Sequence, residues 1–285
     1  MINRLKSFLI PLLLSLALFS MVWAVVQLVQ DGWQWYWVGL LLAGLPIVGF
    51  FANLYRFTTV RTRANLPLLT GWVGLAAALT LIDFMWLPTL WAGLLFVGWL
   101  AYVHWYSRLN RNNNEQLVVG RPFPNILLED ESGKPIRSDD LKGQTTLYLF
   151  YRGNWCPLCM AQIKEIAAQY QELARRGVQM VLISPQPHKN TRDLAARFEV
   201  PFIFLVDVQN KAARQLGIDH PYGVPMGVPG YEADTVMPTV VIVGIDGRIL
   251  YADLTDSYRI RPEPAEFLRV LDNKNPIDHQ LGGIR

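Results

Sequence analysis

Charge is scarce in this 285-residue sequence, and what there is lies unevenly. Only 17% of the residues are charged, against roughly 25% in an average globular chain, whereas 52% are apolar. Asp31 is the one charged residue between positions 7 and 55, and Asp83 is the one between 64 and 107. Nine of the ten tryptophans lie before residue 110. These totals exclude a disordered chain, a collagen-like chain and a single water-soluble core.

Cysteine is almost absent, and basic residues form no long run. The two cysteines, Cys156 and Cys159, are too close in sequence to staple a secreted scaffold, and alone they cannot complete a four-ligand zinc site. They are a redox dithiol, half of a metal site or a chance pair. Because no lysine and arginine run is long enough for a nucleic-acid footprint, no nucleic-acid partner is expected.

The apolar stretches of the first 107 residues are long enough to cross a lipid bilayer, which takes about 20 residues. The sequence predicts an α-helical membrane domain of four spans, at about residues 7–29, 35–55, 65–84 and 87–106. The first is expected to be a retained helix and not a cleaved signal peptide, because its apolar run exceeds about 20 residues and no small-x-small site follows. Gly44 and Pro46 should kink the second.

Basic residues flank these segments on one side only. The loops on that side carry Arg4, Lys6, Arg56, Arg61, Arg63, Arg108 and Arg111, and the loops around Asp31 and Asp83 carry none. The positive-inside rule then predicts that both chain ends face the cytoplasm, across an inner or plasma membrane. The helices are interpreted as an anchor or small bundle. A quinone or lipid site is the alternative, since residue types alone do not exclude one.

The second half of the chain alternates strand and helix patterns. Domain boundaries are expected at 1–109 for the membrane domain, 110–116 for a polar linker and 117–285 for an α/β domain. Strands are predicted at 145–151, 178–184 and 203–206, and a hairpin at 239–245 and 248–252 around an Asp-Gly turn. Helices are predicted at 157–176, 191–199, 210–216 and 262–271. This order predicts a parallel sheet covered by helices.

The dithiol falls where the first long strand passes into a helix. Pro157 is favourable at the first helical position, so Cys156 lies at or just before the first turn and Cys159 one turn further. Free N–H groups and the helix dipole should stabilise a thiolate at Cys156. We therefore expect Cys156 to be the low-pKa attacking thiol and Cys159 the resolving thiol.

The residues around the dithiol resemble a known family. The segment Arg152-Gly153-Asn154-Trp155-Cys156-Pro157-Leu158-Cys159 is similar to the active site of the peroxiredoxin-like branch of the thioredoxin superfamily, the alkyl hydroperoxide reductase/thiol-specific antioxidant group. Three later segments fit as well: Ser184-Pro185-Gln186, Val236-Met237-Pro238-Thr239 and YRIRPEP at 258–264. The resemblance covers about residues 117–273.

The resemblance implies a thioredoxin-like fold and roles for several residues. Pro238 would be a cis-proline packed against the dithiol, Trp155 would shield the disulfide, and Met237 and Thr239 would support the site. Two departures stand out. The family places Thr or Ser where this chain has Gly153, and an arginine near the position of Met237. The cation of the site would then come from Arg152, Arg259 or Arg261.

Three functions follow from this reading. The first is a membrane-anchored thiol peroxidase, in which Cys156 attacks a peroxide and Cys159 resolves the sulfenic acid. The second is a thioredoxin-type protein-disulfide reductase, which Gly153 and Met237 favour. The third is a membrane redox sensor or scaffold without turnover. A thioredoxin- or glutathione-type reductant would restore the dithiol, and no metal or organic cofactor is expected.

Overall fold

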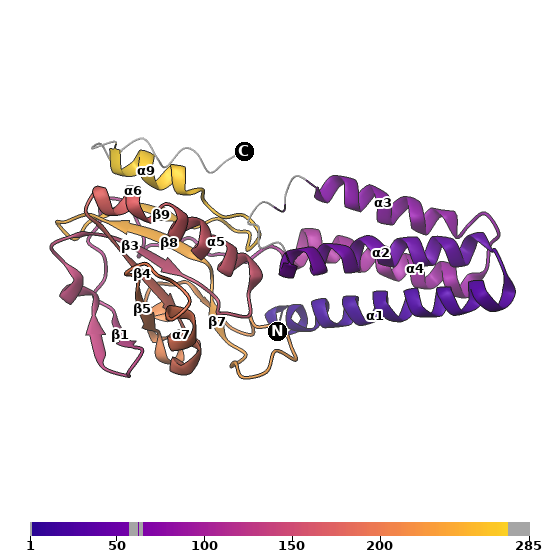
Figure 1. Ribbon diagram of the computed structural model, residues 1–285, viewed down its shortest axis with the longest axis horizontal. Coiled ribbons are helices and arrows are strands. Elements are labelled where there is room, and N and C mark those ends of the chain that lie inside the picture. Colours follow the sequence, from indigo (N-terminus) through magenta and orange to yellow (C-terminus); the bar gives the residue numbers. More distant parts are fainter. Residues whose placement is uncertain (1, 57–61, 63–64, 273–285) are drawn as a thin grey trace. The chain divides into compact units, whose positions relative to one another are not determined.

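The computed structural model describes residues 2–56, 62 and 65–272 (Figure 1). The chain divides into two compact units. One comprises Met1–Arg108 with Pro225–Gly227, and the other comprises Leu109–Val224 with Val228–Arg285. Each unit is described separately.

The first unit consists of apolar helices. They are α1 (Ile2–Asp31), α2 (Trp35–Arg56), α3 (Leu66–Leu79) and α4 (Trp86–Leu100), and α4 continues into one π-helical turn, η1 (Ala101–Tyr106). Three helical stretches of the described residues are long and apolar enough to cross a membrane: Ile2–Asp31, Trp35–Arg56 and Trp86–Tyr106. The segment expected at 65–84 forms only the 14-residue helix α3, about 21 Å long, and then turns.

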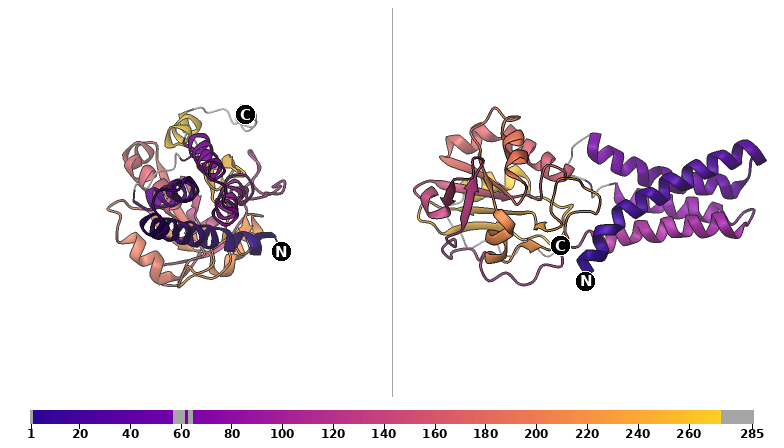
Figure 2. Two further views of the ribbon diagram at one scale, coloured as in Figure 1. Left: turned by 90° about the vertical axis from the view of Figure 1, so that its right-hand side faces the viewer. Right: turned by 90° about the horizontal axis from the view of Figure 1, so that it is seen from below.

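The four helices pack side by side, with α2 in contact with the other three (Figure 2). Gly39 of α2 permits a close approach to α3, since a Cβ there would lie 2.7 Å from the Ala76 carbonyl oxygen. At the opposite end, Trp99 donates from Nε1 to Thr70 Oγ1 at 2.9 Å. Its ring lies 5.3 Å from Phe50 and 5.5 Å from Tyr102, centroid to centroid. The core of this unit is therefore aromatic and tightly packed.

The second unit is built on a seven-stranded mixed sheet of order β2-β1-β5-β4-β3-β8-β9. Its strands are β1 (Leu127–Asp130), β2 (Pro135–Arg137), β3 (Thr145–Phe150), β4 (Val178–Ser184), β5 (Ile203–Val206), β8 (Thr239–Val243) and β9 (Ile249–Asp253). β3, β4 and β5 are parallel, and β8 pairs with β3 in the antiparallel sense. A separate two-stranded sheet joins β6 (Asp219–His220) to β7 (Thr235–Val236). The expected α/β architecture is confirmed, but the sheet is mixed, because β8 and β9 run antiparallel to their neighbours.

The helices of this unit follow the predicted order with shifted ends. They are α5 (Pro157–Ala168), α6 (Tyr170–Arg175), α7 (His188–Ala195), α8 (Lys211–Gln215) and α9 (Pro264–Asp272). The single helix expected at 157–176 is interrupted at Gln169, whose backbone leaves helical geometry at φ −99° and ψ 9°. β4 and β5 have the predicted bounds, and the Asp246-Gly247 turn joins β8 to β9, with Gly247 at φ 78°. β1, β2, β6 and β7 were not predicted.

Alternation along the central strands divides the core between the two faces of the sheet. Tyr148 and Phe150 of β3 belong to one buried cluster, which includes Ala212 and Leu216 from α8 and its C-terminal end. The opposite face carries the buried Leu147 and Leu149, and helices cover it as well. Pairing of Phe150 with Thr239 brings the start of β8 to the end of β3, beside the loop that leads into α5.

Candidate functional site

Cys156 and Cys159 lie at the start of α5, as the sequence predicts. Cys156 is the N-cap residue, with an extended backbone at φ −90° and ψ 106°, and Pro157 occupies the first helical position. The N–H of Cys156 donates to the Gly153 carbonyl at 3.1 Å, which closes the turn before the helix. The Cys156 carbonyl accepts the first helical hydrogen bond, from Met160 N–H at 3.1 Å. The two sulfur atoms are therefore held one turn apart.

The dithiol is reduced and shut off from solvent. Cys156 is 1% exposed and Cys159 is 0% exposed, and the two thiols share a hydrogen bond. Burial, followed by the hydrogen bond and the charge of Cys159, raises the pKa of Cys156 well above its ordinary value. Burial also acts to raise the pKa of Cys159. The hydrogen bond from Cys156, the charge of Arg261 and the Arg152 backbone N–H outweigh it and bring that pKa to about 6.

In this closed arrangement the hydrogen bond between the thiols favours the anion on Cys159, whereas the sequence predicts Cys156 as the more acidic, attacking thiol, and the two roles stay a prediction. The N–H of Arg152, which precedes the turn, acts on Cys159. Cys156 donates the hydrogen bond between the two thiols, which acts to lower the pKa of Cys159.

Arg152 lies beneath the dithiol loop and is 3% exposed. Its guanidinium stacks over the Trp155 ring at 4.8 Å and over the Tyr258 ring at 5.5 Å, and Nη2 donates to the Gly223 carbonyl. Its own carbonyl accepts from Thr235 Oγ1 at 2.8 Å. Arg152 and Trp155 are thus brought to the dithiol, where the charge of Arg152 acts to lower the pKa of both thiols.

Arg261 is the second buried cation of the site, at 8% exposed. Its charge also acts to lower the pKa of both cysteines. Nη1 donates to the Ile260 carbonyl at 3.0 Å, while Nε and Nη2 have no hydrogen-bond partner among the described residues. Of the three arginines considered in the sequence, Arg152 and Arg261 act on the dithiol, and Arg259 is not among the groups with the largest effect.

A third arginine, Arg111, was not identified as a site residue. It comes from the polar segment before the domain, yet its Nη2 donates to the Pro238 carbonyl at 2.5 Å and to Thr239 Oγ1 at 3.1 Å. Burial and then the charge of Arg261 lower the pKa of Arg111 to about 10, against the opposing charges of Asp253 and Asp256. No local pattern could have shown this, because the two partners are 127 residues apart.

The segment at 236–239 lies where it was expected but in a different conformation. The described residues contain no cis peptide bond, so the prediction of a cis-proline at Pro238 is wrong. Pro238 directly precedes β8, so its missing N–H removes no hydrogen bond from the sheet. The trans form is the preferred one for a peptide bond before proline. Met237 packs partly against the hydrophobic core, and Thr239 is buried, with Oγ1 donating to the Met237 carbonyl at 2.8 Å.

A polar network centred on Gln186, between β4 and α7, supports the dithiol loop. Gln186 accepts from the Asn154 N–H at 2.9 Å, and its Nε2 donates to Tyr151 Oη at 3.0 Å and to Thr191 Oγ1 at 3.2 Å. The Asn154 side chain donates to the Asn190 carbonyl at 2.8 Å. Burial, with the nearby charge of Cys159, raises the pKa of Tyr151 far above its ordinary value, so this phenol stays protonated.

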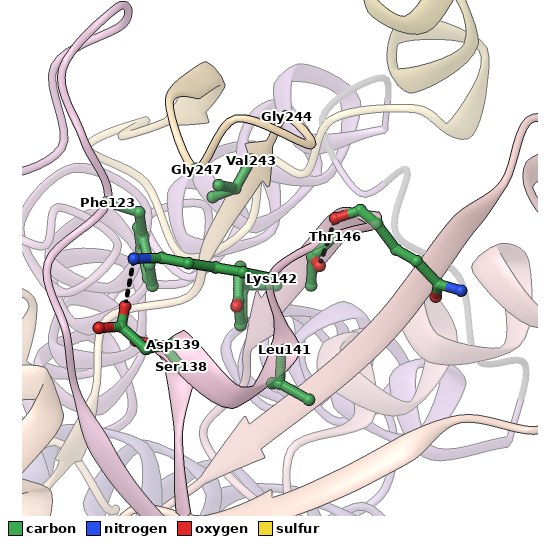
Figure 3. A pocket seen from close by; sticks show the side chains of 11 residues that line it. Phe123, Ser138, Asp139, Leu141, Lys142, Thr146, Val243, Gly244 and Gly247 are labelled. Atoms are coloured by element: carbon green, nitrogen blue, oxygen red, sulfur yellow. Dashed lines mark hydrogen bonds and ion pairs between the residues drawn. The ribbon is translucent and has the colours of Figure 1, made fainter.

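The second unit contains a small hollow and a larger groove. The first, at the other end of β3 and β8, has a volume of about 10 Å³, room for one water at most. Figure 3 shows Lys142 reaching across it to Asp139, at 2.7 Å. The second is a groove of about 940 Å³, whose lining includes Arg261, Asp253, Asp256 and Glu266. In the described part of the chain, no three His, Cys, Asp or Glu side chains cluster as metal ligands would.

Known proteins match the second unit. Residues 119–252 match the model of the AhpC/TSA family. Chloroplastic peroxiredoxin Q from Sedum lineare is 26% identical over 103 residues, which is 36% of this chain and 55% of that protein. The thiol-disulfide oxidoreductase ResA from Bacillus subtilis (strain 168) is 36% identical over 70 residues, 25% of this chain and 38% of ResA. The chain thus spans about half or less of the length of these relatives.

Solved structures also match. The peroxidoxin BcpB from Mycobacterium tuberculosis aligns with 55% of this chain and 97% of its own, at 21% sequence identity and a TM-score of 0.46. The AhpC of the same organism aligns with 55% of this chain and 92% of its own, at 19% identity and a TM-score of 0.42.

Proposed function

Starting from an AhpC/TSA family domain at residues 119–252, we propose that this protein is a membrane-anchored thiol peroxidase that uses Cys156 and Cys159. The observation that carries the proposal is the buried, reduced dithiol at the start of α5, with the charges of Arg152 and Arg261 acting on both sulfur atoms. Because both thiols are almost inaccessible, a small peroxide is a better substrate for this arrangement than a folded protein.

The reaction proceeds in two steps. The proton shared by the thiols moves to Cys159, and the Cys156 thiolate attacks the peroxide oxygen, so that the O–O bond breaks. Sulfur is oxidised to a sulfenic acid, and the peroxide leaves as an alcohol or water after taking up a proton. The Cys159 sulfur then attacks the Cys156 sulfur, forming the disulfide and releasing a second water. A thioredoxin- or glutathione-type dithiol returns two electrons to complete the cycle.

Turnover and trapping test these roles. The full-length protein in detergent should consume hydrogen peroxide with a dithiol reductant, and Cys156→Ser should abolish this. In Cys159→Ser, a sulfenic-acid probe should label Cys156, because the resolving thiol is gone. Label on Cys159 in the Cys156→Ser variant would reverse the two roles. Absence of peroxide consumption by the wild-type chain would contradict the peroxidase.

A protein-disulfide reductase is the second candidate. It is supported by the 36% identity to ResA, whose name is thiol-disulfide oxidoreductase, and by Gly153 and Met237, which depart from the peroxidase pattern. Reduction of a protein disulfide in parallel with hydrogen peroxide, at equal enzyme concentration, separates the two. Efficient turnover of the disulfide with slow peroxide consumption would favour the reductase.

The proposed anchor is a four-span bundle that leaves both chain ends in the cytoplasm. The short helix α3 crosses with help from the turn after it, and the exposed apolar side chains Leu68, Trp72, Leu75, Leu81, Ile82 and Phe84 support its contact with lipid. A reporter active only outside the cytoplasm should give no signal after Arg285 and a strong one when inserted beside Asp83. A signal after Arg285 would contradict the orientation, and none beside Asp83 would contradict the third span.

A further inference from the structure

Arg111 is fixed at the edge of the dithiol site by contacts from both its backbone and its side chain. Its backbone N–H donates to Asp256 Oδ1 at 2.8 Å, and Nε donates to the Thr255 carbonyl at 3.1 Å. Nη2 reaches Pro238 and Thr239, which begin β8 next to the end of β3. The side chain therefore joins the segment after β9 to the segment that borders the dithiol loop.

The charge of Arg111 faces two carboxylates and one cation. Asp253 and Asp256 act to raise its pKa, and Arg261 acts to lower it. The carboxylates are occupied by neutral donors: Asp253 accepts from Thr255 N–H at 3.1 Å and Oγ1 at 2.5 Å, and Asp256 accepts from the Arg111 N–H. Arg111 therefore supplies a positive charge close to both carboxylates.

Arg261 acts through its charge both on Arg111 and on the two thiols. It lines the groove that also contains Asp253, Asp256, Glu263, Glu266 and Arg269. Glu266 is engaged by Tyr251, whose hydroxyl donates to it at 2.9 Å. Two nitrogens of Arg261, Nε and Nη2, have no hydrogen-bond partner among the described residues. The Ile260 carbonyl holds only Nη1 of this guanidinium, so Nε and Nη2 can respond to a change in the balance of charge around them.

We propose that Arg111 is a positioning residue of the dithiol site: it holds the Pro238–Thr239 backbone and offsets Asp253 and Asp256, so that Arg261 stays directed at the dithiol. The proposal deepens the peroxidase function and rests on Cys156 and Cys159 being its reactive groups. Without Arg111, the two aspartates would attract the uncommitted donors of Arg261. The dithiol would then lose a cation that favours its thiolate. A residue outside the matched family range, 119–252, is thereby part of the site.

The test is a pH titration of the thiolate, measured by ultraviolet absorbance of the reduced full-length protein in detergent, with the Cys156→Ala/Cys159→Ala variant as the blank. Arg111→Gln should raise the midpoint of thiolate formation by about one pH unit. At pH values below the midpoint, the thiolate fraction is then roughly tenfold lower. Arg111→Lys keeps the positive charge, so its midpoint should lie between that of Arg111→Gln and that of the wild type. Arg121→Gln is the matched control, because Arg121 is exposed and its side chain donates to the Glu115 carbonyl, away from the dithiol, and its midpoint should not move.

Two charge variants test whether Arg111 acts on Arg261 by offsetting Asp253 and Asp256. Arg111→Gln/Asp253→Asn/Asp256→Asn should return the midpoint to the wild-type value, because nothing then competes for Arg261. Asp253→Asn/Asp256→Asn alone keeps every Arg111 hydrogen bond, so it stays informative if Arg111→Gln does not fold, and it should lower the midpoint. Any of three results would overturn the proposal. They are an unmoved midpoint in folded Arg111→Gln, a shift that the triple variant retains, and a double variant that does not lower the midpoint. The titration needs no turnover, so a failed peroxidase assay leaves this result standing.

Discussion

Gly153 lies directly against the indole of Trp155. A Cβ at position 153 would approach Trp155 Cδ1 and Nε1 to 2.9 Å and Tyr231 Cε1 to 3.2 Å. The backbone of Gly153 is also at φ 140°, a conformation that L side chains rarely adopt. The departure from the Thr or Ser of the resembling family therefore has a steric reason in this chain. The loop passes so close beneath Trp155 that only glycine fits.

Replacing this glycine should destabilise the protein. Gly153→Ala adds both backbone strain and three contacts shorter than van der Waals distance, so we expect a loss of about 2–3 kcal/mol in unfolding free energy. Gly177→Ala is the matched control, since Gly177 has φ 69° and nothing within 4 Å of its Cβ position, and it should lose only about 1 kcal/mol. Thermal unfolding of both variants in detergent measures the difference. Equal losses of unfolding free energy in the two variants would mean that the contact of the new Cβ with Trp155 does not destabilise the protein.

Gln186 should be needed for the stability of the dithiol loop. Gln186→Met keeps the volume of the side chain but leaves the Asn154 N–H and the Tyr151 hydroxyl without their partner, at a cost of about 1–3 kcal/mol. Gln215→Met removes only an exposed hydrogen bond to the Asn125 carbonyl and should change stability by less than about 0.5 kcal/mol. Chemical denaturation of the two variants compares them, and a Gln186→Met variant as stable as the control would contradict the network.

Arg261 and Arg259 should differ in their effect on the dithiol. Arg261→Gln removes a charge that favours the thiolate, so the midpoint of thiolate formation should rise by about one pH unit. Arg259→Gln, two residues away, should leave it within about 0.3 unit, because that charge is not among those acting most on either cysteine. Ultraviolet titration of both reduced variants is the measurement. A larger shift in Arg259→Gln would show that the cation was assigned to the wrong arginine.

Much of the α/β unit could be predicted because its signals are local. The runs at 178–184 and 203–206 are apolar and β-branched over the length of one strand, and both strands have the predicted bounds. Pro157 marks the helix start, and with it the position of Cys156 as the N-cap. By contrast, β6 and β7 contain two residues each and exist only because they pair across a 14-residue loop. Such short strands have no periodicity to detect.

The parts of the site that escaped prediction depend on long-range contacts. Arg111 has the sequence context of a basic residue beside a membrane helix, and only the folded chain places it against Pro238. The groups that act on Cys159 are also distant in sequence or lie outside α5. They include the Arg152 N–H and the Arg261 charge, which no pattern within that helix could indicate.

The hydrogen bond between the two thiols gives the last prediction. The pKa of Cys159 is lowered to about 6, and the largest of the lowering causes is the donor on Cys156. Cys156→Ala removes that donor, so the pKa of Cys159 should rise toward the ordinary thiol value of about 8.5. Cys156→Ser keeps an O–H in the same place and should hold the pKa close to 6. Ultraviolet titration of the two reduced single-cysteine variants makes the comparison.

The same hydrogen bond should make stability depend on pH. A thiol whose pKa is lower in the folded than in the unfolded chain stabilises the fold fully above the unfolded value, and loses that contribution as pH falls through the folded one. The stability advantage of Cys156→Ser over Cys156→Ala should therefore be largest above about pH 8.5 and shrink toward pH 6. Thermal unfolding at both ends of this range measures it. Equal midpoints of titration in the two variants, or a stability difference that does not change with pH, would mean that the anion on Cys159 is stabilised by the arginines alone.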